Sequence, residues 1–412
     1  MINLALLREE PQRITDLIKK KDPSFDVAKL IKLDEQMRVI TQAVEELRSE
    51  KNELADRGKQ GITPEIRERS IALGKELKER EEEHKIVAAQ FKDLYLYCPN
   101  LLFDDVPVGN KEENVVVKEV GSKPIFNFEP KNHVELGEAL GWFDFAAAAR
   151  MTASNFALYK GDCVKLLYAL EMFMLNNNMA HGYQPVLPPY LINEKALEGA
   201  SNFPRFKDQV YEIGADGLYL TPTSEVNLAN LYRDTIFSTE ELPIRMTSLT
   251  SCFRREAGGY GGSERGLIRI HQFEKLELFS ITRPEDSPAE QDRMIACAES
   301  ILKKLDVHYR ISLLAAQDCS FASAKTYDIE IWMPGQKEYK EVSSVSNCTD
   351  YQARRCAIRY RKDASSKPQL VHTLNGSSLA LPRLMVALIE AGQRADGTIE
   401  FPDVLKSVTI GV

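Results

Sequence analysis

A stretch near the middle of the chain concentrates residue types that bind charged and planar groups. Residues 252–279 read CFRREAGGYGGSERGLIRIHQFEKLELF. Arginine grips phosphate or carboxylate through paired donors, an aromatic ring can stack on a base, and a carboxylate can accept hydrogen bonds from an ammonium or amino group. Together these residue types predict a site for a nucleoside triphosphate and an amino acid.

The second half of this stretch alternates with the period of a β-strand. We expect its apolar face to consist of Ile268, Ile270, Leu276 and Leu278, and its polar face of Arg269, His271, Phe273, Lys275 and Glu277. The glycine-rich segment 258–266 is expected to form a loop between two strands. An exposed strand pair with a solvated charged face is the alternative interpretation, but the alternation of guanidinium, ring and carboxylate favours a binding site.

The composition sets limits on the rest of the molecule. At 412 residues and 43% hydrophobic content, the chain can bury a sizeable core, and two or three domains are expected. The formal net charge is −8. Any contact with nucleic acid must therefore depend on local basic patches rather than on an overall positive field.

The cysteines and the hydropathy pattern predict a soluble, cytoplasmic protein. Seven cysteines are scattered without a CxxC pair or a cysteine–histidine cluster, which argues against a zinc site and favours reduced thiols. The sequence opens without a signal-peptide pattern. No apolar run approaches the roughly twenty residues that a membrane span needs.

Residues 33–98 carry a heptad-like pattern that predicts an antiparallel helical hairpin with its tip near residues 57–63. Thr63 and Pro64 form a suitable N-cap and first-turn pair for the second helix. Arms of this length would extend on the order of 45 Å. A hairpin used only for packing or dimerisation is the alternative interpretation. The apolar seam consists of Leu33, Met37, Ile40, Val44, Leu47, Leu54, Ile66, Leu73, Leu77, Val87, Phe91, Leu94 and Cys98.

The remainder of the chain has a mixed pattern of short apolar strands, turns and helices such as 161–180. Residues 98–109 are interpreted as a linker that ends the second helix. We therefore expect two domains, a helical hairpin domain at 1–105 and one α+β domain at 106–412.

The ordered set of motifs resembles the seryl-tRNA synthetases, which are class II aminoacyl-tRNA synthetases. HGYQPVLPPYL (181–191) resembles motif 1 with its proline at Pro189, residues 253–256 resemble the core of motif 2, and LNGSSLALPRLMVALIE (374–390) resembles motif 3. The resemblance implies an antiparallel sheet with flanking helices and a homodimer. Motif 3 is expected to be a helix that begins near Ser377, with Arg383 about two turns in.

The resemblance also implies residue roles for nucleotide binding. Arg254 would contact the α-phosphate and the amino-acid carboxylate, and Arg269 and Arg383 would hold the remaining phosphates; these arginines are the expected catalytic groups. Glu256 would accept from the adenine amino group, and Phe273 would stack on adenine. Mg²⁺ would accompany ATP and be coordinated by Glu341 and Ser344, because it prefers oxygen ligands.

The amino-acid pocket and the RNA-binding surface are implied in the same way. The residues matching the serine pocket are Thr223, Glu225, Arg254, Glu277, Asn375 and Ser377. Glu277 is expected to be dispensable for folding, since it falls on the polar face of its strand. The hairpin would bind serine tRNA through Arg48, Lys51, Arg57, Lys59 and Lys75.

Two other readings remain open from the residues alone. A synthetase-like binding protein that has lost catalysis should show broken arginines or metal ligands, whereas Arg254, Glu256, Arg269, Glu341 and Arg383 are all present. A prolyl or threonyl enzyme would share the chemistry. The long hairpin argues against the former, and the lack of a cysteine–histidine set argues against zinc-dependent recognition of threonine.

Overall fold

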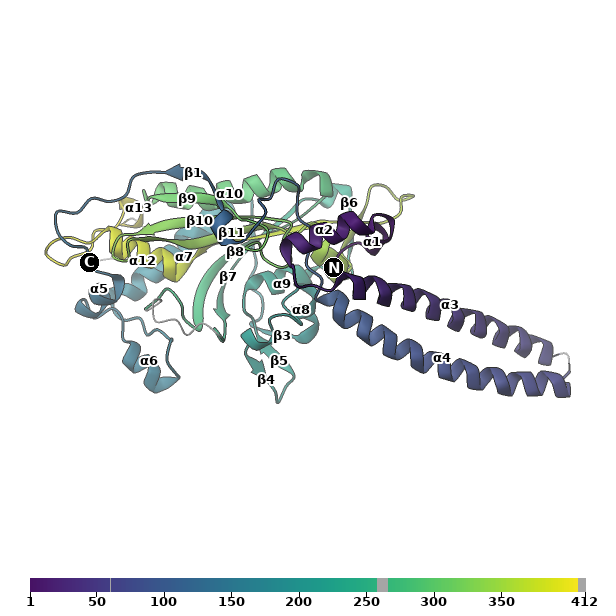
Figure 1. The fold of residues 1–412 in the computed structure, drawn as a ribbon. Coiled ribbons are helices and arrows are strands. Elements are labelled where there is room, and N and C mark those ends of the chain that lie inside the picture. Colours follow the sequence, from purple (N-terminus) through teal and green to yellow (C-terminus); the bar gives the residue numbers. More distant parts are fainter. Residues whose placement is uncertain (60, 258–265, 407–412) are drawn as a thin grey trace. The chain divides into compact units, whose positions relative to one another are not determined.

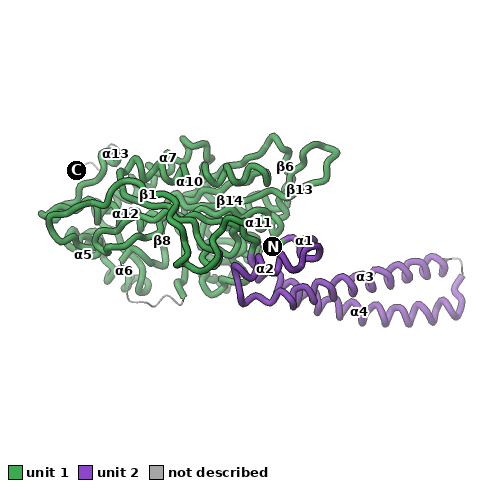
Figure 2. Tube along the Cα trace, turned by 45° about the horizontal axis from the view of Figure 1, so that its top comes forward, with its two compact units in different colours: residues 1–2, 100–412 green, residues 3–99 purple. Residues whose placement is uncertain are grey.

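The computed structural model describes residues 1–59, 61–257 and 266–406, so the predicted glycine-rich loop lies almost entirely outside the described residues. The chain forms two compact units, residues 3–99 and residues 1–2 with 100–412, which are coloured separately in Figure 2. All seven cysteines are free thiols with buried side chains. Within the described residues, no helix combines the length and the apolar character that crossing a bilayer requires.

The smaller unit is helical and confirms the predicted hairpin. Its helices are α1 (Leu4–Glu9), α2 (Pro11–Lys21), α3 (Val27–Gly58) and α4 (Pro64–Leu96). Along α3 and α4, the apolar seam residues of the heptad pattern are buried or half-buried. Thr63 caps α4 by accepting a hydrogen bond from the Ile66 N–H, with Pro64 in the first turn.

Polar side chains fix the register of the two long helices. Arg69 of α4 makes two hydrogen bonds of 2.6 Å to the Glu50 carboxylate of α3. Nearer the base of the hairpin, Thr41 and His84 lie 3.2 Å apart, at one of the seam positions where the apolar pattern is interrupted. Both contacts cross from one helix to the other, so they specify which residues face each other.

The larger unit is built on an eight-stranded sheet with the order β1-β9-β10-β11-β14-β8-β7-β2 (Figure 1). Neighbouring strands are antiparallel except for β2 and β7. The α+β prediction is therefore confirmed. The strands are β1 (Val115–Val120), β2 (Gln184–Pro185), β7 (Ile244–Phe253), β8 (Gln272–Thr282), β9 (Tyr309–Leu313), β10 (Lys325–Met333), β11 (Glu338–Asn347) and β14 (His372–Ala380).

Helices and two small sheets surround this sheet. The helices are α5 (His133–Ala139), α6 (Phe145–Met151), α7 (Asp162–Ala180), α8 (Glu194–Gly199), α9 (Ser224–Leu231), α10 (Ser287–Lys304), α11 (Tyr351–Cys356), α12 (Leu381–Ala391) and α13 (Asp403–Lys406). The small sheets comprise β13 (Gln369–Leu370), β12 (Arg359–Arg361) and β6 (Ile236–Ser238), and β3 (Leu191–Asn193), β5 (Leu218–Leu220) and β4 (Glu212–Ile213).

The central strands present one apolar and one polar face. Leu278 of β8, Val345 of β11 and Leu374 of β14 form a buried cluster with Met294 and Cys297 of α10. Because successive side chains alternate across a strand, the neighbours of these residues point to the opposite face. That face is polar in the middle of the sheet, where β11, β14 and β8 lie side by side.

One expectation about the chain path is wrong, and the structure adds detail to another. The β8 strand begins at Gln272 rather than at Ile268, because the backbone before it is bound by side chains: the Leu267 N–H donates to His133 and the Ile268 carbonyl accepts from Arg383. The interpreted linker is also packed structure. Leu102 and Val106 are buried against Leu314, Ala316 and Cys319.

Candidate active site

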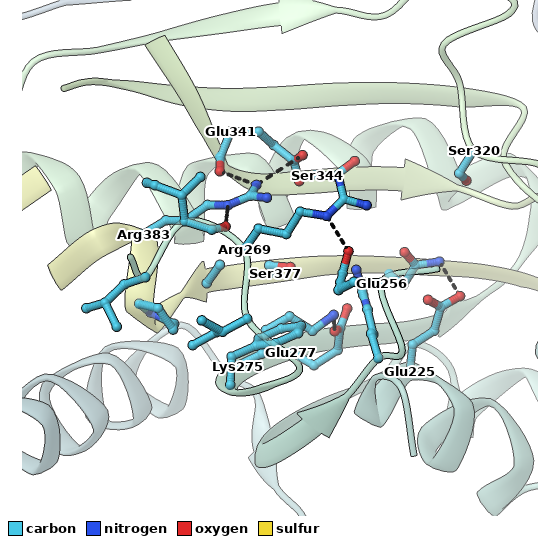
Figure 3. A pocket seen from close by; sticks show the side chains of 18 of the residues that line it. Glu225, Glu256, Arg269, Lys275, Glu277, Ser320, Glu341, Ser344, Ser377 and Arg383 are labelled. Atoms are coloured by element: carbon cyan, nitrogen blue, oxygen red, sulfur yellow. Dashed lines mark hydrogen bonds and ion pairs between the residues drawn. The ribbon is translucent and has the colours of Figure 1, made fainter. Parts of the chain in front are cut away.

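A cavity of about 490 Å³ opens on the polar face of the central strands (Figure 3). Strands β8, β11 and β14, the first turns of α9 and α12, and the segments on either side of residues 258–265 all contribute to its wall. Except for Thr223, the predicted ATP- and amino-acid-site residues line this one cavity: Glu225, Arg254, Glu256, Arg269, Phe273, Glu277, Glu341, Ser344, Asn375, Ser377 and Arg383.

A buried charged group occupies the β8 side of the cavity. Phe273, Lys275 and Glu277 project from alternate positions of β8 into the cavity wall. Lys275 forms an ion pair with Glu277 and donates to the Thr223 hydroxyl at 2.7 Å, and that hydroxyl donates to Glu277 at 3.0 Å. Thr223, the N-cap of α9, is thus bound to both members of the pair without facing the cavity itself.

The burial of Glu277 corrects the expectation that its loss would leave folding unaffected. The residue is only 1% exposed. Removing its carboxylate would leave the Lys275 ammonium and the Thr223 hydroxyl in a buried place without their acceptor, which is destabilising. Glu277 therefore stabilises the site as well as lining it.

Glu225 supplies a second carboxylate beside this pair. Its Oε1 accepts from Gln352 Nε2 at 2.7 Å and from Asn375 Nδ2 at 3.0 Å. Burial, together with the nearby negative charge of Glu277, raises the pKa of Glu225 to about 7. A cation placed between Glu225 and Glu277 would favour the ionised carboxylate, so this end of the cavity suits an ammonium group.

Two arginines on the motif 2 segments, Arg254 and Arg269, line the cavity. Arg254 places its guanidinium carbon 5.3 Å from the centre of that ring, and its Nε donates to the Pro222 carbonyl at 3.2 Å. Arg269 forms an ion pair of 2.6 Å with Glu256. The guanidinium of Arg254 thus lies within cation–π distance of the ring, and Phe273 also lines the cavity, where a planar base could stack on it.

Arg383 reaches the cavity from a helix, as expected, but from a different turn of that helix. Residues 372–380 form strand β14 and the helix α12 begins at Leu381, so Arg383 lies in the first helical turn rather than two turns in. Pro382 explains the start, because proline suits the first turn of a helix and cannot pair within a sheet interior. Arg383 Nη1 donates to the Glu341 carbonyl at 2.7 Å and lies 3.4 Å from its carboxylate.

A β-bulge places the two predicted metal ligands on one face. Ser343 pairs with Ile329 and Glu341 pairs with Glu330, so Val342 is an extra residue in β11. In a regular strand, Glu341 and Ser344 would point to opposite faces because they are three residues apart. With the bulge, both line the cavity.

Asp328 of β10 completes an oxygen-rich cluster that the sequence did not single out. It pairs with Ser344 across the sheet and accepts a hydrogen bond from that hydroxyl, while its Oδ1 is buried without a partner. Burial and the nearby Glu341 carboxylate raise the pKa of Asp328 well above its ordinary range. Carboxylate and hydroxyl oxygens gathered in this way fit a hard divalent cation.

Three residues of the site carried no role in the sequence reading: Lys275, Asp328 and Gln352. Lys275 was detectable by its parity with Phe273 and Glu277 on one strand. Asp328 and Gln352 lie on other elements, β10 and α11, so only the fold brings them near Glu341 and Glu225. His271, on the same predicted polar face, instead accompanies Phe156 in a stacked ring pair and contacts the Arg254 carbonyl at 2.8 Å.

The predicted RNA-contacting side chains all lie on the long hairpin or at its tip. Arg48 forms an ion pair of 2.7 Å with Glu81, and Lys59 one of 2.7 Å with Asp56. Lys51, Arg57 and Lys75 are exposed. Arg48 and Lys59 would have to exchange a carboxylate for a phosphate in order to contact RNA.

The cavity thus combines four carboxylates with four cations on an antiparallel sheet. Residues 209–392 match the model of the tRNA synthetase class II core domain (G, H, P, S and T). Fold and cavity together define a class II aminoacyl-tRNA synthetase. Residues 1–102 match the seryl-tRNA synthetase N-terminal domain.

Relatives extend this likeness over the whole chain. The serine–tRNA ligase of Syntrophobacter fumaroxidans is 41% identical over 414 residues, covering 98% of each chain. The enzyme of the same name from Acidithiobacillus ferrooxidans is 42% identical, covering 98% of this chain and 97% of its own. The crystal structure of seryl-tRNA synthetase from Pyrococcus horikoshii complexed with ATP has a TM-score of 0.92 at 34% identity, covering 99% of this chain and 98% of that one. The chain belongs to the seryl-tRNA synthetase family.

The raised pKa of Glu225 predicts a pH dependence of amino-acid binding. Only the ionised carboxylate attracts an ammonium group, and a raised pKa means that this form is lost as pH falls through about 7. We expect the KM for the amino-acid substrate to rise progressively from pH 8 to pH 6, measured by ATP–pyrophosphate exchange. The Glu225→Gln variant should bind the amino acid weakly, with a KM that hardly changes over this range; an unchanged slope in that variant would contradict the assignment.

Proposed function

We propose that the protein activates serine with ATP to form seryl-adenylate and pyrophosphate, and then transfers the seryl group to the 3′ end of serine tRNA. The observation that carries this proposal is the composition of the single cavity. Two carboxylates that suit one ammonium group lie beside three arginines that suit a triphosphate. Membership of the seryl-tRNA synthetase family supports the same activity.

The amino-acid end of the cavity suits a small polar side chain. Glu225 and Glu277 would hold the substrate ammonium, and Asn375 and Ser377 line the same cavity, with Thr223 bound to Glu277. A substrate hydroxyl would form hydrogen bonds with polar groups of this wall, whereas alanine, which has no hydroxyl, would form none. This difference is the basis for rejecting alanine strongly.

In the first step, a carboxylate oxygen of serine attacks the α-phosphorus of ATP, and the bond to the β-phosphate oxygen breaks to release pyrophosphate. We assign Arg254 to the α-phosphate and the serine carboxylate, and Arg269 and Arg383 to the departing pyrophosphate. Their charge stabilises the transition state, and no general base is required. In the second step, a ribose hydroxyl of the tRNA attacks the seryl carbonyl carbon, and AMP leaves.

The ion pairs in the cavity suggest how the nucleotide is accommodated. Arg269 is bound to Glu256 and Arg383 to Glu341. Phosphates that take over the two arginines would release both carboxylates at once. Glu256 would then accept from the adenine amino group beside Phe273, and Glu341 would be free to bind a cation.

ATP–pyrophosphate exchange tests the proposal directly. Serine should support exchange, while alanine, proline and threonine tested side by side should support little or none. Exchange driven by proline or threonine would contradict the choice of substrate. A chain that bound ATP and serine without exchange would instead be a binding protein that has lost catalysis.

We propose that Mg²⁺ binds with ATP at Glu341 and Ser344, with Asp328 as a further oxygen ligand, and that zinc plays no part. When bound, the ion would supply positive charge beside the phosphates of ATP. The support is the partnerless buried Oδ1 of Asp328 beside those two residues. The side chains of Asp328, Glu341 and Ser344 all offer oxygen atoms.

The Asp328→Asn variant tests this metal site. It keeps the size of the side chain but removes the charge, so we expect the Mg²⁺ concentration for half-maximal exchange to rise about tenfold. The exposed Glu338→Gln variant, on the neighbouring strand and paired with Lys340, is the matched control. Equal Mg²⁺ requirements in the two variants would exclude Asp328 as a ligand.

We propose that residues 1–105 form the tRNA-binding domain and residues 106–412 the catalytic domain. The hairpin binds the long variable arm of serine tRNA by contacting its backbone, as suits recognition of RNA by shape. Arg48, Lys51, Arg57, Lys59 and Lys75 supply the cations. The reaction takes place in the cytoplasm.

Charge reversal on the hairpin should separate the two steps of the reaction. In a variant with Lys51→Glu, Arg57→Glu and Lys75→Glu, serine-dependent exchange should be normal, whereas the KM for tRNA should rise about a hundredfold and its salt dependence should weaken. A variant with Lys111→Glu, Lys362→Glu and Lys367→Glu carries the same charge change outside the hairpin. Equal effects on tRNA charging in both variants would contradict the assignment.

We propose that the protein is a homodimer that covers an apolar surface on α7 and the motif 1 segment. Tyr168 and Met172 on α7 are 61% and 47% exposed, and Leu187 is 77% exposed. Exposed apolar side chains gathered in this way are typical of an interaction surface.

The Tyr168→Glu/Leu187→Glu double variant should sediment as a monomer, because two carboxylates would be buried at the contact without partners. The Ile62→Glu variant, which also adds a charge at a 77% exposed apolar position, should remain dimeric. A dimer of unchanged stability in the double variant would place the contact elsewhere.

A further inference from the structure

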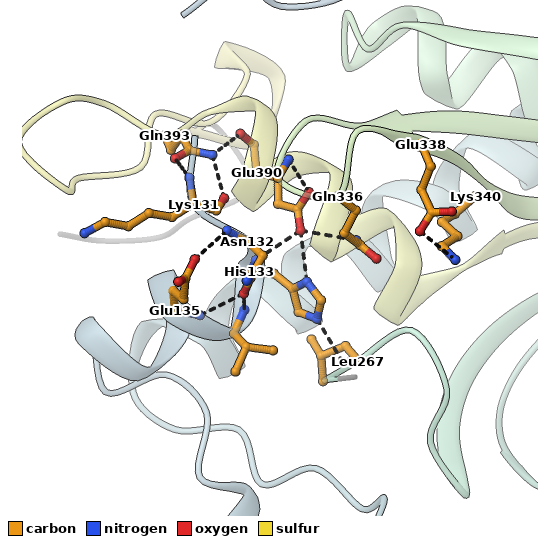
Figure 4. Close-up of polar contacts among 12 residues, drawn as sticks. Lys131, Asn132, His133, Glu135, Leu267, Gln336, Glu338, Lys340, Glu390 and Gln393 are labelled. Carbon is orange, nitrogen blue, oxygen red and sulfur yellow. Dashed lines mark hydrogen bonds and ion pairs between the residues drawn. The ribbon is translucent and has the colours of Figure 1, made fainter. Parts of the chain in front are cut away.

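A buried histidine–glutamate pair lies at the end of α12, close to the cavity wall (Figure 4). His133 is 2% exposed and Glu390 is fully buried. The Oε1 atom of Glu390 accepts from the His133 backbone N–H at 3.0 Å and lies 3.0 Å from His133 Nδ1. The carboxylate also accepts from the backbone N–H of Gly335 at 2.9 Å and from Gln336 at 3.3 Å.

The start of α5 explains why His133 is held so firmly. Helix α5 begins at His133, and Asn132 and Glu135 form a capping box in front of it. The Asn132 side chain accepts from the N–H groups of Val134 and Glu135. The remaining N–H of this turn, that of His133, donates its hydrogen bond to Glu390.

The hydrogen bonds fix the tautomer of His133. Its Nε2 lies 3.1 Å from the backbone N–H of Leu267, which can only donate, so Nε2 must be the acceptor. The single proton of the neutral ring is therefore on Nδ1 and is donated to Glu390. Glu390 thus keeps the ring in the one form that can bind Leu267.

Leu267 and its neighbour Ile268 line the cavity and lead directly to Arg269. They are bound from two sides. His133 accepts from the Leu267 N–H, and Arg383 Nε donates to the Ile268 carbonyl at 3.3 Å. Arg383 and Glu390 both belong to α12 and lie about two turns apart on one face.

Gly266 shows how closely the backbone approaches the histidine. A Cβ atom at Gly266 would lie 2.2 Å from His133 Nε2 and 2.5 Å from Val134 Cγ2, and the φ angle of +70° is itself unfavourable for other residues. The chain can therefore pass the ring only with glycine at this position.

We propose that His133 is a positioning residue for ATP: through Leu267, it holds the backbone that carries Arg269 in place while Arg383 leaves Ile268 to bind phosphate. In the free enzyme, both side chains fix this segment. Once ATP has taken the Arg383 guanidinium, the hydrogen bond from the Leu267 N–H to His133 still holds this segment. The inference rests on the proposed activation of serine with ATP and adds to it a residue that contacts no substrate.

Two substitutions separate the functions of the two ring nitrogens. In His133→Asn, the side-chain amide can replace Nδ1 as a donor to Glu390 but cannot reach Leu267. In His133→Gln, the longer side chain can place its amide oxygen where Nε2 was. The Gln336→Ala variant is the control, because it removes a hydrogen bond to the same carboxylate without affecting Leu267.

The measurement is ATP–pyrophosphate exchange by the full-length protein, with KM for ATP, KM for serine and kcat determined separately, alongside thermal unfolding. We expect His133→Asn to lower kcat/KM for ATP about fivefold to tenfold, as for the loss of one hydrogen bond. The KM for serine should be unchanged, and His133→Gln and Gln336→Ala should resemble the wild type.

Two results would overturn the inference. The first is an unchanged kcat/KM for ATP in His133→Asn. The second is an equal loss of activity in His133→Asn and His133→Gln that affects the kinetics for ATP and for serine alike and is proportional to the fall in Tm. If His133→Asn does not fold, the Gly266→Ala variant tests the same point, because its Cβ atom would push the His133 ring away from Leu267. A normal KM for ATP in that variant would overturn the inference. Absence of serine-dependent exchange in the wild type would instead refute the proposed function.

Discussion

Charges inside a partly buried cavity must be compensated, and this constraint organises the site. Removing an ion from water is costly, so each charged group needs an opposite charge or several hydrogen bonds nearby. Lys275 compensates Glu277, Arg269 compensates Glu256, and Arg383 compensates Glu341. Glu225 has only hydrogen bonds and a raised pKa. Each of these four carboxylates thus has a partner in the absence of substrates. In the two pairs outside the amino-acid end, Arg269–Glu256 and Arg383–Glu341, a substrate phosphate could replace the carboxylate as the partner of the arginine.

The amino-acid end and the nucleotide end of the cavity differ in how firmly their charged groups are held. At the amino-acid end, Lys275 is nearly buried and bound to Thr223 as well as to Glu277, so the pair is a fixed part of the wall. At the nucleotide end, Arg269 and Arg383 are more exposed than Lys275, and each forms an ion pair with a carboxylate. A rigid end suits discrimination between small amino acids, whereas an end whose ion pairs can be exchanged suits a highly charged ligand.

The sequence predicted the hairpin and the polar face of β8 because both depend on short-range periodicity. The seam from Leu33 to Leu94 and the alternation of Phe273, Lys275 and Glu277 are visible without knowledge of the fold. The start of β8 and the strand before α12 were misjudged, since both depend on contacts with distant residues. His133, for example, binds Leu267 across 134 positions of the chain. Asp328 and Gln352 were missed for the same reason.

The bulge at Val342 has a consequence for how this protein can vary. Deleting that one residue would restore regular pairing between β10 and β11 and would leave the sheet hydrogen bonds more complete. Glu341 and Ser344 would then be two residues apart and would still share a face, because the side chains of a regular strand alternate. A strand that kept Val342 but paired regularly would instead turn these two side chains to opposite faces. The three-residue spacing from Glu341 to Ser344 and the bulge therefore belong together: a sequence that keeps this spacing also has to keep the bulge if both side chains are to line the cavity.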